Sequence, residues 1–148
     1  MKKLLSFLLF SIMLIACSSQ KKQAPTSQFS PEKQLNLLTQ KALKNIDLIP
    51  LDSMNVPRSI NEDGSLNGVK TRDWTSGFYA GTFWGLYRHS QNEQLKKAAM
   101  DWTAFQKKER FDDHTHDLGF KIYCSFGEGF RQMNNEDYKQ VIIDASEQ

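Results

Sequence analysis

The sequence lacks three features, and each absence argues against a class of protein. Charge of one sign is not in excess, since the 148 residues hold 19 Lys and Arg against 17 Asp and Glu. Nucleic-acid binding needs a surplus of cations on one face, so we expect no nucleic-acid partner. No segment sustains a period-two alternation of apolar and polar residues, which argues against a β-sheet protein. The apolar run from Leu4 to Ala16 is too short to span a bilayer.

That apolar run has the composition of an export signal. Lys2 and Lys3 precede it, and its length suits the hydrophobic segment of a signal peptide. It ends in Leu14-Ile15-Ala16-Cys17, which resembles a bacterial lipobox. We therefore predict that residues 1–16 are a lipoprotein signal peptide and that Cys17 becomes the lipidated first residue of the mature protein. An ordinary secretory signal and an uncleaved anchor are the alternatives.

Lipidation at Cys17 leads to further expectations. Residues 17–28 are polar and would form a flexible tether to a domain over residues 29–148. Cys124 has no other cysteine to pair with, so we expect no intrachain disulfide and interpret Cys124 as a small core residue. Without the two lysines of the signal, 17 basic residues balance 17 acidic ones, and the lipid alone would anchor the protein. The serine after Cys17 favours the outer membrane, on its periplasmic side or at the cell surface.

Helix signals follow one another along residues 29–148. Apolar residues recur at helical spacing, and Ser, Asn or Asp stands before the expected starts. We predict five helices: from Ser30-Pro31 to Pro50, from Thr75 or Ser76 onward, from about Asn92 to Arg110, from Asp117 or Leu118 onward, and from Asn135 onward. The long loop over 51–70 would hold at most one short hairpin, around Asp63-Gly64. The predicted fold class is all-α.

Two kinds of residue predict how these helices pack. The first helix carries an apolar face that consists of Leu35, Leu38, Ala42, Ile46 and Ile49. The second helix carries glycine at positions 77, 81 and 85, which predicts the close approach of another backbone. We interpret the two glycines of Phe126-Gly127-Glu128-Gly129-Phe130 as packing residues too, because the spacing of a phosphate loop is missing.

Asp73-Trp74-Thr75-Ser76-Gly77-Phe78 is the first segment that could carry function. One interpretation is a capped helix start with a buried tryptophan. The other is a tryptophan platform at the rim of a sugar-binding pocket, where a flat apolar face meets polar groups at its edge. The residues alone do not favour one over the other.

Asp112-Asp113-His114-Thr115-His116-Asp117 concentrates titratable groups just before apolar residues and Gly119. A metal site is one interpretation, but further ligands are missing and His89 lies far away, so we expect no metal. Capping of the fourth helix by Thr115 or Asp117 is a second. The third is that Asp117 donates a proton, because partial desolvation favours a protonated carboxyl and the glycine lets a substrate approach.

Two motifs together resemble those of the unsaturated glucuronyl hydrolases, glycoside hydrolase family 88. They are Asp73-Trp74-Thr75-Ser76-Gly77-Phe78-Tyr79-Ala80-Gly81, followed by Trp84, and His116-Asp117-Leu118-Gly119-Phe120. The resemblance covers residues 28–148 and implies an α/α barrel of six helical hairpins, of which this chain would supply an incomplete first part. It implies no cofactor. Because the last helix shows no C-terminal signal before Gln148, we expect an N-terminal fragment that is poorly folded and inactive alone.

The family removes a 4,5-unsaturated uronic acid from oligosaccharides that polysaccharide lyases produce. An aspartic acid protonates the vinyl ether at C4, water adds at C5, and the resulting hemiketal opens. By resemblance, Asp117 is this acid, while His116 and Trp74 line the substrate pocket. The second pocket aspartate of the family would lie beyond Gln148, because Asp144 follows Asp117 too closely.

Two alternatives remain open. An unsaturated rhamnogalacturonyl hydrolase would share the barrel and the reaction but take pectin-derived substrates. A non-catalytic glycan-binding lipoprotein would use Trp74 without needing Asp117 as an acid.

Overall fold

The computed structural model describes residues 29–148. The predicted signal peptide over 1–16, the lipidation of Cys17 and the tether over 17–28 lie outside the described residues. Within the described part of the chain, no helix has both the length and the apolar character that a membrane crossing requires.

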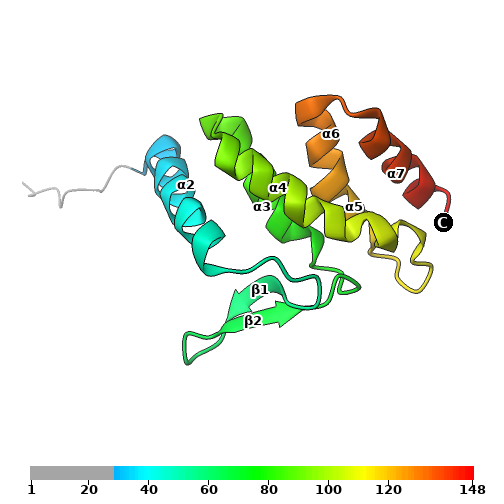
Figure 1. Ribbon diagram of the computed structural model, residues 1–148, viewed down its shortest axis with the longest axis horizontal. Helices are drawn as coiled ribbons and strands as arrows, with labels where there is room; N and C mark the ends of the chain where they lie inside the picture. The colour runs from blue at the N-terminus through cyan, green and yellow to red at the C-terminus, as the bar shows by residue number, and fades with distance from the viewer. Residues whose placement is uncertain (1–28) are drawn as a thin grey trace, which may run out of the picture.

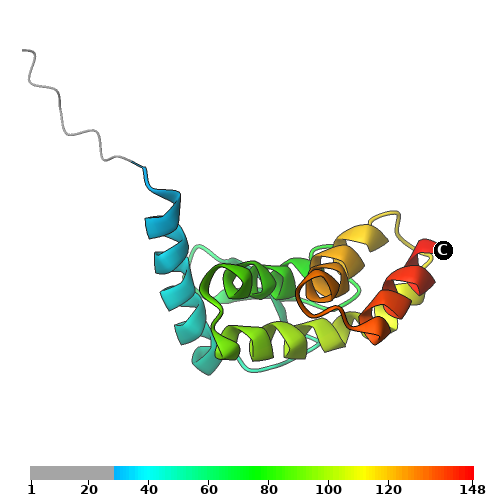
Figure 2. The ribbon, with the colours of Figure 1, turned by 90° about the horizontal axis from the view of Figure 1, so that it is seen from above.

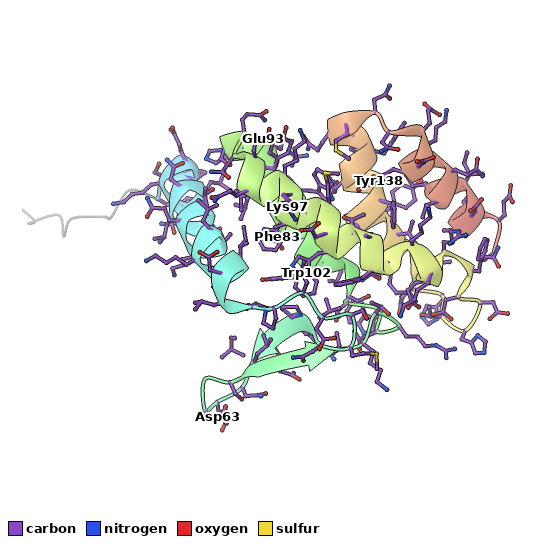
Figure 3. The ribbon with its side chains drawn as sticks, viewed as in Figure 1. Asp63, Phe83, Glu93, Lys97, Trp102 and Tyr138 are labelled. Atoms are coloured by element: carbon purple, nitrogen blue, oxygen red, sulfur yellow. The ribbon has the colours of Figure 1, made fainter. Side chains whose placement is uncertain are left out.

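Helices dominate the described residues, as the predicted all-α class requires. The elements in order are α2 (Pro31–Leu48), β1 (Val56–Ile60), β2 (Leu66–Val69), α3 (Gly77–Ser90), α4 (Glu93–Ala104), η1 (Phe105–Phe111), α5 (Leu118–Ile122), η2 (Tyr123–Gly127), α6 (Glu128–Met133) and α7 (Glu136–Ser146). The strands form an antiparallel hairpin with Asp63 at its tip, where the sequence predicted one (Figures 1 and 3).

Three of the five predicted helix starts are confirmed by capping, whereas α3 and α5 begin without a side-chain cap. The side chains of Ser30, Asn92 and Asn135 each accept a hydrogen bond from a backbone N–H in the first turn that follows. These bonds satisfy donors that have no partner inside the helix. The helices α3 and α6 end at Gln91 and Asn134, which both take positive φ angles of 54° and 50°.

The third predicted helix is α-helical over only part of its expected length. After Ala104 the chain tightens into the 3₁₀ helix η1, in which residues three apart share one face. Gln106 and Glu109 have this spacing, and both side chains are buried against the segment before α3. The tighter helix therefore aims two polar side chains at the same segment, Glu109 at Thr71 and Gln106 at Ser76, which apolar periodicity does not predict.

Close backbone contact aligns two helices. The segments α5, η2 and α6 form one continuous helix with a π-helical turn at η2, and it runs parallel to α3. A Cβ added to Gly77 would lie 2.4 Å from the Lys121 carbonyl oxygen, and one added to Gly81 would lie 2.6 Å from that of Cys124. The predicted close approach is thus confirmed at these two glycines. It is wrong for Gly85, whose added Cβ would meet nothing within 4 Å.

The parallel helices form one row and their partners a second. Figure 2 shows α3 beside the continuous α5–η2–α6 helix, with α4 and α7 along the other side and α2 at the end opposite α7. The main core lies between α3 and α4 and includes Phe83, Trp84, Leu95 and Trp102. Gly129 packs against Trp84 and Tyr138, which confirms the packing interpretation of that glycine.

The apolar face of α2 is only half covered in the described residues. Its C-terminal part packs on the core through Ala42, Ile46 and Ile49. Leu35 and Leu38, predicted on the same face, are 37% and 50% exposed. The predicted apolar face is therefore covered only in part within residues 29–148, although α3 also reaches the N-terminal half of α2, where His89 Nε2 lies 3.0 Å from Asn36 Oδ1.

Replacing Gly81 by alanine should destabilise the protein, and replacing Gly85 should not. The Gly81→Ala methyl would force two backbones apart, which costs about 1–3 kcal/mol. Gly85→Ala has room and should be neutral or stabilise α3 by up to about 1 kcal/mol. Thermal unfolding followed by circular dichroism measures both. Equal midpoints for the two variants would contradict the close contact.

Candidate active site

The two candidate segments lie side by side because the helices that follow them are parallel. The Asp73–Ser76 turn precedes α3, and the Asp112–Asp117 turn precedes α5. Gly77 contacts the backbone of Phe120 and Lys121, so the two N-terminal ends are neighbours. Figure 1 shows both ends on the side of the molecule that also carries the β1–β2 hairpin.

A tight turn presents Trp74. The Asp73 carboxylate accepts hydrogen bonds from the Thr75 N–H (2.9 Å) and the Thr75 hydroxyl (2.5 Å), and Arg58 of β1 lies 3.6 Å away. Burial raises the pKa of Asp73, but the bonds from Thr75 and the charges of Arg58 and Lys121 bring this pKa below its ordinary value. The carboxylate thus holds the turn and links it to the hairpin.

Three aromatic rings form a patch at this end of the helices. Trp74, Phe78 and Phe120 have ring centroids 5.7–6.0 Å apart. Their exposed fractions are 43%, 39% and 47%, so all three leave apolar surface open to solvent. Trp74 is therefore not the buried tryptophan of the capping interpretation. An exposed set of rings can stack on the apolar face of a sugar.

Asp117 lies one turn before Phe120, whose N–H donates to the Asp117 carbonyl. It occupies the N-cap position of α5, yet its side chain makes no capping bond. Thr115 Oγ1 instead accepts the Asp117 N–H at 3.0 Å. The carboxyl group is half-buried, its side chain 31% exposed, and its ion-pair neighbour is the exposed His116, 3.8 Å away. Within residues 29–148 this carboxylate has no structural hydrogen bond, so it is available to a ligand.

The titratable cluster divides into two parts. Asp112, Asp113 and His114 bring one ligand atom each within 4.8 Å of one another, as a cation site requires. His116 and Asp117 do not belong to that group. Asp112 already pairs with Lys121, so its charge is neutralised, and we assign no metal to the cluster.

Lys121 is the residue of this region that sequence reasoning missed. Its side chain is fully buried, and its ammonium lies 2.6 Å from Asp112 Oδ2 and 3.6 Å from Glu109 Oε2. It also donates to the Arg72 carbonyl at 3.4 Å. The sequence signal was the position of this lysine, between Phe120 and Ile122 in a helix with predicted apolar residues. Because charged side chains inside proteins are paired, a lysine at such a position indicates an acidic partner.

Further buried polar side chains extend this network to the start of α3. Thr71 Oγ1 donates to Glu109 Oε1 at 2.6 Å, and Ser76 Oγ lies 2.7 Å from the Thr71 carbonyl and 3.0 Å from Gln106 Oε1. All four side chains are buried. The 3₁₀ helix η1 thereby holds the turn that carries Trp74.

Known proteins resemble the chain over 77% to 99% of its length. No protein-family model matches it. An unsaturated glucuronyl hydrolase from Formosa agariphila is 34% identical over 151 residues, which cover 99% of this chain and 38% of that protein. The crystal structure of an unsaturated glucuronyl hydrolase specific for heparin is 31% identical with a TM-score of 0.68, and the match covers 77% of this chain and 31% of that one. The chain is a homologue of the unsaturated glucuronyl hydrolases.

A more distant unsaturated glucuronyl hydrolase, from Streptococcus agalactiae, shares the fold at 22% identity and a TM-score of 0.62. That match covers 82% of this chain and 33% of the other. This chain thus spans about a third of the relatives' length, from 31% to 38%. The helical hairpins described above are an incomplete part of the α/α barrel of these hydrolases, as the two motifs predicted.

The interpretation of Cys124 needs correction. The thiol is free but only half-buried. It lines a groove of about 440 Å³ between α3 and the η2–α6 segment, together with Phe78, Arg88, Tyr123 and Glu128. Burial, together with the negative charge of Glu128, raises the pKa of the Cys124 thiol. Cys124 is only half-buried because Gly81 packs on one side of it, whereas within residues 29–148 its other side is open.

Acid should weaken the fold through Asp112. The hydrogen bond from Lys121 lowers the pKa of Asp112, burial raises it by less, and the His114 N–H and Arg72 lower it further. A lowered folded-state pKa stabilises the fold above the unfolded value, about 3.9, and this contribution is lost as the pH falls below it.

Urea unfolding of Asp112→Asn at pH 7 and pH 3 tests this. The variant should lose about 1–3 kcal/mol at pH 7 and show a smaller decrease than the parent between the two pH values. Asp113→Asn, at the exposed neighbouring position, is the matched control and should stay within about 0.5 kcal/mol. Equal pH dependence in the parent and Asp112→Asn would contradict the role of the buried pair.

Proposed function

We propose that the protein is a glycosidase that releases the 4,5-unsaturated uronic acid from lyase-generated oligosaccharides. One observation carries the proposal: the Asp117 carboxyl, free of any capping role, lies one helical turn from an exposed aromatic patch. Homology to unsaturated glucuronyl hydrolases over 99% of the chain supports the same reaction.

In this reaction Asp117 acts on carbon and not on the glycosidic oxygen. Its carboxyl proton goes to C4 of the vinyl ether, and the C4–C5 double bond supplies the electron pair. Water then bonds to C5 and returns a proton to the carboxylate. The hemiketal formed at C5 opens, and the leaving sugar departs. Asp117 can serve both steps because its side chain is partly shielded from water and makes no capping hydrogen bond to the helix.

Trp74 and His116 would hold the substrate. Trp74 offers an exposed face, and its contacts with Phe78 and Phe120 fix the plane of the ring. His116 lies beside Asp117 with its imidazole in solvent, where it can donate a hydrogen bond to a sugar hydroxyl or carboxylate. Space for the sugar exists next to Asp117, because a Cβ added to Gly119 would meet nothing within 4 Å.

The cellular setting remains a proposal from the sequence. The lipobox-like Leu14-Ile15-Ala16-Cys17 supports an exported protein that a lipid on Cys17 anchors to the outer membrane. An enzyme held there would meet oligosaccharides from extracellular lyases before or during their uptake.

Asp117→Asn should abolish turnover in the full-length protein. An amide cannot donate a proton to an alkene carbon, so the loss of absorbance of the conjugated double bond should slow at least about a hundredfold. Asp113→Asn, four residues earlier and exposed, should keep the parent rate. Turnover by Asp117→Asn at the parent rate, or binding by the parent without turnover, would favour a glycan-binding lipoprotein.

A substrate panel should show preference for glycosaminoglycan disaccharides over pectin-derived ones. One relative is described as specific for heparin, and a Streptococcus agalactiae relative was crystallised with dGlcA-GalNAc6S, which supports that substrate class. The measurement compares kcat/KM for chondroitin, hyaluronan and heparin disaccharides with that for an unsaturated rhamnogalacturonan disaccharide. A higher value for the last would assign the rhamnogalacturonyl activity instead.

A further inference from the structure

We propose that Lys121 is a positioning residue that sets the place of Asp117 relative to Trp74. The inference rests on the proposed function, because it concerns the same site. Lys121 contacts neither side chain. It acts through the two turns that carry them.

A buried lysine at this position needs a reason. Removing an ammonium from water costs several kcal/mol, and an apolar side chain of similar size often stabilises a fold equally well or better. Lys121 is nevertheless fully buried in α5 between Phe120 and Ile122. What the ammonium provides is three hydrogen-bond donors that point in different directions.

Those donors serve both turns at once. Toward the turn of Asp117, the ammonium holds Asp112 Oδ2 at 2.6 Å, and the other carboxylate oxygen of Asp112 accepts the His114 N–H at 3.2 Å. Toward the turn of Trp74, the ammonium lies 3.4 Å from the Arg72 carbonyl oxygen, two residues before the tryptophan. One charged group thus fixes the start of both segments.

The contact with Glu109 completes the bridge. Glu109 Oε2 lies 3.6 Å from the ammonium, and Glu109 Oε1 accepts a hydrogen bond from the Thr71 hydroxyl at 2.6 Å. This bond is a second attachment of the turn that carries Trp74, beside the Arg72 contact. An apolar residue at 121 would fill the space but leave the two turns free to shift relative to each other. A shift of about 1 Å between an acid and the platform that orients its substrate can cost about a hundredfold in rate.

The test separates positioning from stability. A triple variant, Lys121→Met with Asp112→Asn and Glu109→Gln, removes the bridge without leaving an unpaired buried charge, and the amide at 109 can still accept the Thr71 hydroxyl. Lys121→Arg keeps the charge as the conservative variant. The control is Lys97→Met with Asp101→Asn, which removes an ion pair of the same 2.6 Å length on the exposed face of α4 (Figure 3).

Each full-length variant is assayed on the unsaturated disaccharide that the parent turns over fastest, well below its melting midpoint and per folded molecule. The triple variant should stay folded with kcat lowered at least about tenfold and KM within about threefold, because the rings that bind the sugar remain. Lys121→Arg should recover part of kcat, and the control pair should leave it unchanged.

The outcomes distinguish the two proposals. If the parent turns over the substrate and Asp117→Asn does not, but the triple variant keeps the parent kcat, Lys121 is merely structural and only this inference fails. If the triple variant does not fold, Lys121→Arg decides alone, because its larger planar guanidinium keeps the charge but cannot hold all three acceptors at the same distances. A lowered kcat with KM unchanged then supports positioning, and a kcat equal to that of the parent overturns it. If the parent has no activity on any unsaturated disaccharide, the proposed function fails and this inference fails with it.

Discussion

Lys121, with Asp112 and Glu109, connects the parts of this protein that carry its proposed chemistry. The ammonium is fully buried, and its partners come from the turn before α5, from η1 and from the turn before α3. The partner farthest from Lys121 in the sequence is Arg72, 49 residues earlier. In the low dielectric of the interior, a paired charge of this kind is costly to disturb, so the turns are held in one arrangement.

Two glycines make that arrangement possible. Gly77 and Gly81 let the backbone of α3 approach the continuous helix that starts at α5, so the helices run parallel and both begin at the same end. A longer side chain at either position would separate the helix starts, and the Lys121 ammonium would no longer reach the Arg72 carbonyl. Backbone contact and the buried ion pairs therefore act together, and the aromatic patch and Asp117 lie where both constraints meet.

Local signals predicted the helix starts well. Ser30, Asn92 and Asn135 cap helices because their side chains satisfy backbone donors only a few residues away, which the sequence shows directly. Interactions with distant segments were harder to predict. The 3₁₀ helix η1 exists where Gln106 and Glu109 reach a turn 30 and 38 residues earlier, and nothing in the local pattern marks that turn as their partner.

The sequence by itself determined the helical class, the hairpin at Asp63-Gly64 and the two motifs that resemble the unsaturated glucuronyl hydrolases. These depend on capping, periodicity and turn residues, which act over a few positions. Only the tertiary structure decided that Trp74 is exposed within a three-ring patch, that Asp117 is not used as a cap, and that a buried lysine joins their turns. The physical reason is range: whether a side chain is buried, paired or free depends on segments that the fold brings together from far along the chain.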